Sequence, residues 1–152
     1  MNTIGYLKNL LFAAAGVTLL LTACSKGSNP QGSSAVPNVT VNLSININNA
    51  PYTALTTVGG VVNLTNVGNR GIILFRLNAT TITAFDRTCP YDISNNNGIV
   101  GAQSNGTGLC IDCGSTYNLG NGGVNTGPST IGLKQYNTSS FNATSGALTI
   151  TN

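Results

Sequence analysis

GIILFRLNATTITAFD, residues 71–86, contains two largely apolar runs separated by the short break Asn78-Ala79. Both runs are rich in β-branched and aromatic residues, which favour strands, and the break between them is short enough for a tight turn. A third run, VVNLT at residues 61–65, precedes them across the turn NVGNRG, whose Asn and Gly residues tolerate positive φ. The stretch therefore predicts three consecutive antiparallel strands.

The strand pattern continues on both sides of this stretch. VTVNLSINI, residues 39–47, alternates apolar and polar side chains, which is typical of a strand with one buried face. Shorter runs of the same kind follow at residues 115–119, 133–138 and 145–151. Since no window has a useful helical period and the chain contains 19 glycines, we expect residues 39–152 to form one all-β domain, a small antiparallel barrel or sandwich.

The first 38 residues indicate export. Lys8 is followed by an apolar run over residues 10–21, which is shorter than the about 20 residues of a membrane-spanning helix and is typical of a signal peptide. Leu21-Thr22-Ala23-Cys24 resembles a bacterial lipobox, which implies cleavage after residue 23 and a diacylglycerol on Cys24. Residues 24–38, small and polar with two prolines, predict a flexible tether. We expect a lipid anchor at the periplasmic face of the outer membrane, which Ser25 favours.

The charged residues exclude two classes of function. The chain has six Lys and Arg residues, three acidic residues and no histidine. Nucleic-acid binding requires clustered cations, and none are clustered here, so we expect no nucleic-acid partner. Without a histidine base, and with no obvious pairing of the three aspartates, the sequence predicts that the protein is not an enzyme.

Three cysteines remain once Cys24 is lipidated: Cys89, Cys110 and Cys113. An odd number of thiols in an oxidising compartment predicts one pair and one unpaired thiol. Their contexts are AFDRTCPYD, residues 84–92, and CIDCGSTYNLGNGGVNTGPSTIGLKQY, residues 110–136. Together with the preceding strands, these segments resemble a Rieske [2Fe-2S] domain. That family carries Cys-x-His on one loop and Cys-x-x-His-Gly-Ser on a second, followed by an aromatic strand, Gly-Pro and Leu-x-x-Tyr.

The resemblance extends to individual positions. Cys89 and Cys110 match the two thiolate ligands, and Gly127-Pro128 matches the loop that covers the family's cluster. Further matches are Gly114, Ser115, Tyr117, Leu133 and Tyr136. The departure lies in the other two ligands, because Tyr91 and Cys113 stand where the family has its histidines. Half of the expected coordination sphere is therefore replaced.

Three uses of the thiols are compatible with this resemblance. The preferred one has no cofactor: the family geometry implies a Cys89–Cys110 disulfide, with Cys89–Cys113 as the next choice, that clamps the loops of a binding or structural module. The alternative is an electron carrier with a modified [2Fe-2S] cluster, for which the expected ligands are Cys89, Cys110, Cys113 and Tyr91 or Asp112. The residues expected around that site are Arg87, Asp112, Gly114 and Ser115. Zinc on the three thiolates is a third interpretation. The sequence indicates no particular redox or envelope partner.

Overall fold

The protein folds as three antiparallel sheets. The structure is a computed structural model that describes residues 36–94 and 98–152. The strands form a pair β1-β10 and two four-stranded sheets, β2-β3-β4-β9 and β5-β6-β7-β8. Their bounds are β1 Asn42–Asn46, β2 Val61–Leu64, β3 Ile72–Arg76, β4 Ile82–Asp86, β5 Val100–Ala102, β6 Thr107–Cys110, β7 Thr116–Asn118, β8 Val124–Thr126, β9 Gln135–Tyr136 and β10 Ala147–Thr151. The all-β fold class is as predicted.

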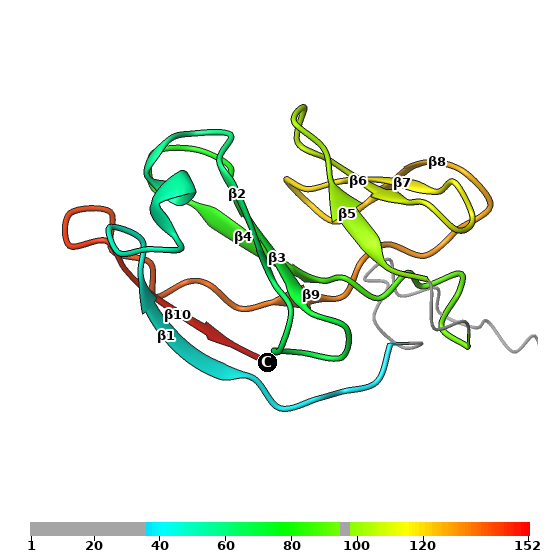
Figure 1. The fold of residues 1–152 in the computed structure, drawn as a ribbon, viewed down its shortest axis with the longest axis horizontal. Helices are drawn as coiled ribbons and strands as arrows, with labels where there is room; N and C mark the ends of the chain where they lie inside the picture. The colour runs from blue at the N-terminus through cyan, green and yellow to red at the C-terminus, as the bar shows by residue number, and fades with distance from the viewer. Residues whose placement is uncertain (1–35, 95–97) are drawn as a thin grey trace, which may run out of the picture.

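The central sheet is built on the stretch 71–86. β3 and β4 form the predicted hairpin, with Leu74 opposite Ala84, and β2 pairs with the other edge of β3. Every residue of β3 and β4 is buried, including the polar residues Arg76, Thr83 and Asp86, so neither strand alternates between buried and exposed positions. Successive side chains of a strand point to opposite faces, so both faces of this sheet must be covered. Figure 1 shows the central sheet with β1 and β10 on one side and β5–β8 on the other.

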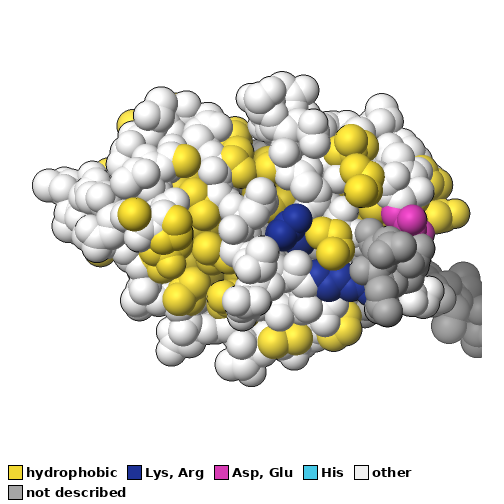
Figure 2. Space-filling view, in the orientation of Figure 1, with side chains coloured by type: hydrophobic (Ala, Val, Ile, Leu, Met, Phe, Trp, Pro, Cys, Tyr) yellow, Lys and Arg dark blue, Asp and Glu magenta, His cyan; other side chains and the backbone are white. Residues whose placement is uncertain are grey.

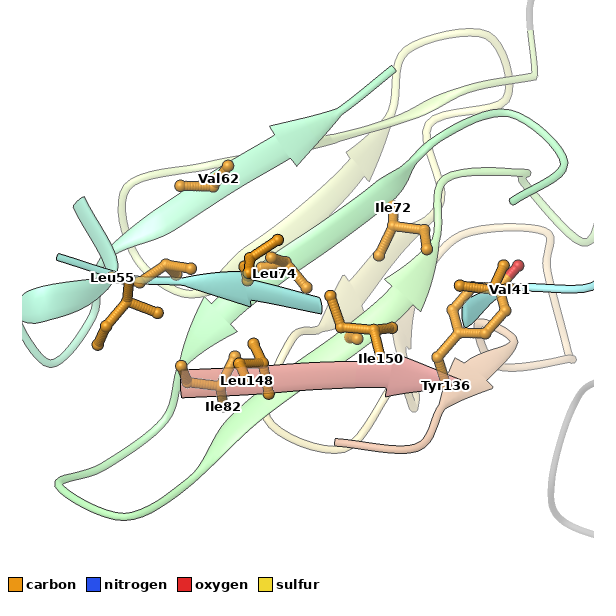
Figure 3. Close-up of a cluster of buried hydrophobic side chains, with 12 residues drawn as sticks. Val41, Leu55, Val62, Ile72, Leu74, Ile82, Tyr136, Leu148 and Ile150 are labelled. Atoms are coloured by element: carbon orange, nitrogen blue, oxygen red, sulfur yellow. The ribbon is translucent and has the colours of Figure 1, made fainter. Parts of the chain in front are cut away.

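One face of the central sheet packs against β1 and β10. Ile72 and Leu74 of β3 belong to the same buried cluster as Leu148 and Ile150 of β10. Figure 3 shows these side chains pointing toward one another between the two sheets. The alternating pattern of β10, with Leu148 and Ile150 buried, therefore follows from its position as a cover over the core.

The opposite face of the central sheet packs against the sheet β5–β8. Ile73 and Phe75 of β3 join Tyr117 of β7 in a second buried cluster, which also contains Cys89 and Cys110. The alternate residues of β3 thus belong to two different cores. The thiols of the candidate site are anchored in the second of them.

Of the two expected architectures, a barrel and a sandwich, the structure shows packed sheets and not a closed barrel. The described strands do not close into a barrel, because the ladder of the central sheet ends at β2 on one side and at β9 on the other. β9 contains only Gln135–Tyr136, so the strand expected at residues 133–138 is mostly loop. The strand expected at residues 39–47 is shorter, at Asn42–Asn46. A single turn of 3-10 helix at Thr53–Thr56 was not predicted.

Within the described residues, no helix has the length and apolarity to cross a membrane.

A buried carboxylate ties the central sheet to its neighbouring loops. The Oδ2 atom of Asp86, the last residue of β4, accepts hydrogen bonds from the Tyr136 hydroxyl at 2.7 Å and the Asn69 backbone at 2.8 Å. Its Oδ1 atom accepts bonds from the Thr88 backbone at 2.8 Å and the Thr88 hydroxyl at 2.6 Å. Burial, and then the bond to Asp86, raises the pKa of the Tyr136 phenol. This network fixes the start of the loop that carries Cys89.

The raised phenol pKa predicts how stability depends on alkaline pH. Unfolded Tyr136 ionises near pH 10, whereas the folded phenol holds its proton at higher pH, so the contribution of the phenol to stability is present below pH 10 and is lost as pH rises above it. We expect the free energy of unfolding to fall more steeply above pH 10 in the wild type than in Tyr136→Phe. Urea titrations of both proteins between pH 8 and pH 11 measure this difference. Parallel pH profiles would contradict the assignment.

Candidate metal site

Three thiols and one carboxylate meet at one place in the fold. The Sγ atoms of Cys89, Cys110 and Cys113 and a carboxylate oxygen of Asp92 all lie within 4.8 Å of one another. Cys89 and Cys110 are fully buried, and Cys113 and Asp92 are half-buried. The two cysteine-bearing segments, distant in sequence, therefore lie side by side, as the sequence predicted. All three cysteines carry free thiols in the structure.

The first segment follows β4 and is held by backbone and arginine contacts. The Cys89 amide donates to the Gly98 carbonyl at 2.8 Å, and the Asp92 amide donates to the Cys89 carbonyl at 3.2 Å. The Arg70 guanidinium donates to the carbonyls of Ile93 at 2.8 Å, Gly98 at 3.0 Å and Asp92 at 3.4 Å. Arginine has five fixed donors, so one side chain can hold several points of a loop at once. Arg70 therefore positions the segment that presents Asp92.

The second segment connects β6 to β7. Cys110 ends β6, and its amide donates to the Ser115 carbonyl at 2.9 Å. The Gly114 amide in turn donates to the Cys110 carbonyl at 2.9 Å. Gly114 has a φ of +77°, a left-handed conformation that glycine adopts without steric cost. The glycine allows the chain to turn back sharply, so that Cys113 faces the Cys89 side of the site.

Each thiol has polar neighbours. Sγ of Cys89 lies 3.6 Å from Sγ of Cys113 and 3.4 Å from the Tyr117 hydroxyl. The Cys113 thiol donates to Oγ of Ser115 at 3.1 Å. The Cys110 thiol donates to Oδ2 of Asp92 at 3.6 Å. Hydrogen bonds to sulfur are long and weak, so the four groups are held mainly by their backbone segments.

Burial favours the protonated form of the Cys110 and Cys113 thiols. It raises the pKa of the Cys110 thiol to about 12, although backbone hydrogen bonds from Cys113 and Asp112 act in the opposite direction. Burial also raises the pKa values of the Cys113 thiol and of the Tyr117 phenol. A cation in the centre of the cluster would reverse this preference, because a coordinating thiol is deprotonated.

Two of the predicted ligands lie outside the cluster. Tyr91 is 56% exposed, and Asp112 is also exposed. Asp112 instead lines a surface cavity of about 520 Å³ together with Arg87 and Ile111. Arg87 donates through Nε to the Val100 carbonyl at 3.0 Å, so it holds the start of β5. The structure brings together the three thiols that the sequence singled out, and it places among them a carboxylate oxygen of Asp92, which the sequence did not suggest as a ligand.

The Gly127-Pro128 segment lies beside the second loop. The Ser129 amide donates to Oγ of Ser115 at 3.0 Å. A Cβ atom at Gly127, whose φ is +108°, would lie 2.4 Å from Cα of Ser115, so only glycine allows this approach. Ser115 thus connects the Cys113 thiol to the Gly127-Pro128 segment. Pro128 itself is exposed.

Charged side chains are sparse on the surface around the site. Figure 2 shows basic groups near the middle of this face and acidic groups at the end where the sheet β5–β8 lies. Two of the protein's three acidic residues, Asp92 and Asp112, belong to the two cysteine-bearing segments. The predicted lipid attachment at Cys24, with the signal peptide and most of the tether, lies outside the described residues.

Asp92 and Arg70 are the residues that reasoning from the sequence missed. A signal for Asp92 was present, because Cys89 and Asp92 have the same two-residue spacing as Cys110 and Cys113. No comparable signal exists for Arg70, which lies 22 residues before the segment that it holds. No model of a known protein family matches this chain, and no curated protein matches it either.

Proposed function

We propose that the protein is a bacterial envelope lipoprotein, anchored through Cys24, whose Rieske-like β domain is a metal-binding module and not an enzyme. The observation that supports this function best is the convergence of three thiols and one carboxylate within 4.8 Å. Thiolate sulfur and carboxylate oxygen are both ligands of zinc in proteins. Four protein ligands fill a tetrahedral site and leave no open position for a substrate, which is the arrangement of structural sites.

The proposed role of the metal is to clamp two loops that present a contact surface. The residues between the ligands point outward: Tyr91 is 56% exposed and Ile111 is 82% exposed. Ile111 also lines the surface cavity next to the site. Exposed apolar side chains on a rigid loop are suited to protein contact. On this proposal the domain is a tethered binding module, and its metal is structural.

A second candidate is the module clamped by a disulfide. It is favoured by the 3.6 Å separation of the Cys89 and Cys113 sulfurs, since a small movement would bring them to the about 2.05 Å of a disulfide. The Cys89–Cys110 pair, which the family resemblance favours, belongs to the same cluster. Export to an oxidising compartment supports either pairing. In this form the site would hold no metal.

Analysis of the native protein distinguishes the two candidates. The full-length protein is extracted from the membranes of its own host without added metal or reductant. We expect metal close to stoichiometric with the chain, and alkylation of Cys89, Cys110 and Cys113 only after chelation, because ligated thiolates are protected. Metal-free protein with a disulfide-linked peptide would establish the second candidate instead. A Cys24→Ala variant should leave the membrane fraction, and its retention there would contradict the anchor.

A further inference from the structure

The site is formed by two matched turns. Cys89 and Asp92 are the first and last residues of one turn, and Cys110 and Cys113 are those of the other. The carbonyl of each leading cysteine accepts a backbone bond. In the first turn the donor is the last residue, Asp92, at 3.2 Å, and in the second it is the residue after the turn, Gly114, at 2.9 Å. Structural zinc sites commonly have two such loops, each with two ligands that are separated by two intervening residues. Here one cysteine of that pattern is replaced by aspartate.

The separations of the ligand atoms match one tetrahedral ion. With a metal–sulfur bond of about 2.3 Å, two ligands of the same ion lie at most about 4.6 Å apart, and about 3.8 Å apart at the tetrahedral angle. The observed Cys89–Cys113 sulfur separation is 3.6 Å, and Cys110 Sγ lies 3.6 Å from Asp92 Oδ2. All four atoms lie within 4.8 Å of one another, so a contraction of a few tenths of an ångström brings every pair within the limit of about 4.6 Å. The cluster is therefore close to the dimensions of a single coordination sphere.

A two-iron cluster does not fit these dimensions. Its ligands are divided between two irons, so ligands of different irons lie further apart than two ligands of one ion. Two irons and two sulfides would also have to occupy the space between atoms that all lie within 4.8 Å of one another. The histidines that complete a Rieske centre are absent from the whole chain. The cofactor of the family that the sequence resembles is therefore not the one for which this site is built.

We infer that the site binds one tetrahedral metal ion, zinc in the first instance, through Cys89, Cys110, Cys113 and Asp92. This inference rests on the proposed function and specifies its metal. Thiolate-rich, closed, four-coordinate sites select zinc over magnesium and calcium, which prefer oxygen ligands. Binding releases the three thiol protons, and Zn²⁺ with three thiolates and one carboxylate carries a net charge of −2.

Hydrogen bonds around the sulfurs are in place to stabilise that charge. The Tyr117 hydroxyl lies 3.4 Å from Cys89, and the Ser115 hydroxyl lies 3.1 Å from Cys113. Once the sulfurs are thiolates, both hydroxyls can turn to donate to them. Two of the three sulfurs thus have a hydroxyl outside the coordination sphere that can donate to them, as metal ligands usually do.

Asp92 and Asp112 provide a matched pair of variants. Both aspartates lie on the site loops, but only Asp92 belongs to the ligand cluster. Metal binding to the metal-free, reduced, full-length protein in detergent is measured by titration with Co²⁺, followed by competition with Zn²⁺. We expect one Co²⁺ per chain with the intense visible bands of tetrahedral sulfur coordination. Asp92→Asn should weaken zinc binding by about 100-fold or more, which is at least the effect of losing an outer-sphere partner.

The control variants separate the ligand set from its alternatives. Asp112→Asn and Tyr91→Phe should bind zinc as the wild type does, and Asp92→Cys should retain one tetrahedral ion. The Asp92→Cys protein keeps the test valid if Asp92→Asn fails to fold, which circular dichroism would reveal. Loss of zinc affinity in Asp112→Asn or Tyr91→Phe, with Asp92→Asn unaffected, would overturn the ligand set.

The composition of the native centre separates this inference from the proposed function. A single zinc or iron ion per chain, without acid-labile sulfide, supports the inference. Two irons with two sulfides per chain would overturn the inference and leave the metal-binding function intact. Absence of metal from the native protein, together with no binding of Co²⁺ or Zn²⁺ by the reduced chain, would overturn both.

Discussion

Replacing Asp86 with alanine should lower the free energy of unfolding by about 4 kcal/mol. The carboxylate is fully buried and accepts four hydrogen bonds, from Asn69, Thr88 and Tyr136. Alanine would leave these buried donors without partners, and each unsatisfied group costs about 1–3 kcal/mol. Urea denaturation of the wild type and of the variant measures the difference.

Two further variants test whether the loss of stability comes from the hydrogen bonds of Asp86. Asp86→Asn retains one side-chain oxygen as an acceptor, so its effect should lie between those of the wild type and Asp86→Ala. Asp112→Ala, on an exposed residue, should change stability by less than about 0.5 kcal/mol. Equal stabilities of Asp86→Ala and Asp112→Ala would show that the network around Asp86 contributes little to the fold.

Zinc should stabilise the metal-free, reduced protein by about 4 kcal/mol when free Zn²⁺ is 1,000-fold above its dissociation constant. For a domain of this size, that corresponds to a rise of about 15 °C in melting temperature. The reason is that the unfolded chain cannot bring the two ligand-bearing turns together, so the ion binds the native state. Calorimetry with Zn²⁺ and with a chelator measures the shift.

The same measurement on Cys110→Ser provides the control. Cys110 is one of the two fully buried residues among the proposed ligands, so its loss should remove most of the zinc-dependent shift while the chelated proteins remain comparable. Zinc and chelator giving the same melting temperature in the wild type would rule out a structural metal. A zinc-dependent shift that persists in Cys110→Ser would place the ion elsewhere in the protein.

The local elements of the fold could be predicted because their signals are local. The hairpin over residues 71–86 needs only two β-forming runs and a short turn, and both are visible in the sequence. The strands at Asn42–Asn46 and Ala147–Thr151 follow from alternation in the same way. The number of layers was not predicted. Residues 72–75 of β3 are apolar on both faces, but their sequence does not say which elements cover each face.

The candidate site was predicted in part for a similar reason. The cysteines are rare residues in recognisable contexts, so their convergence could be anticipated. The position of the Asp92 carboxylate among the thiols depends on how the turn after Cys89 is held, and Arg70 holds this turn from a distant loop. Tyr91 and Asp112 were nearer to the expected motif, yet their side chains point to solvent. Position in a motif therefore did not determine which side chain faces the site.

The central sheet lies between two cores, and only one of them contains residues of the candidate site. This separation affects how the chain can evolve. Among the residues that the structure describes, the core with β1 and β10 contains no residue of the candidate site, whereas the core with β5–β8 contains Cys89 and Cys110. Substitutions among the ligands therefore alter one core while the other continues to specify the hairpin of β3 and β4. A lineage with this architecture can exchange one set of ligands for another through intermediates that still fold.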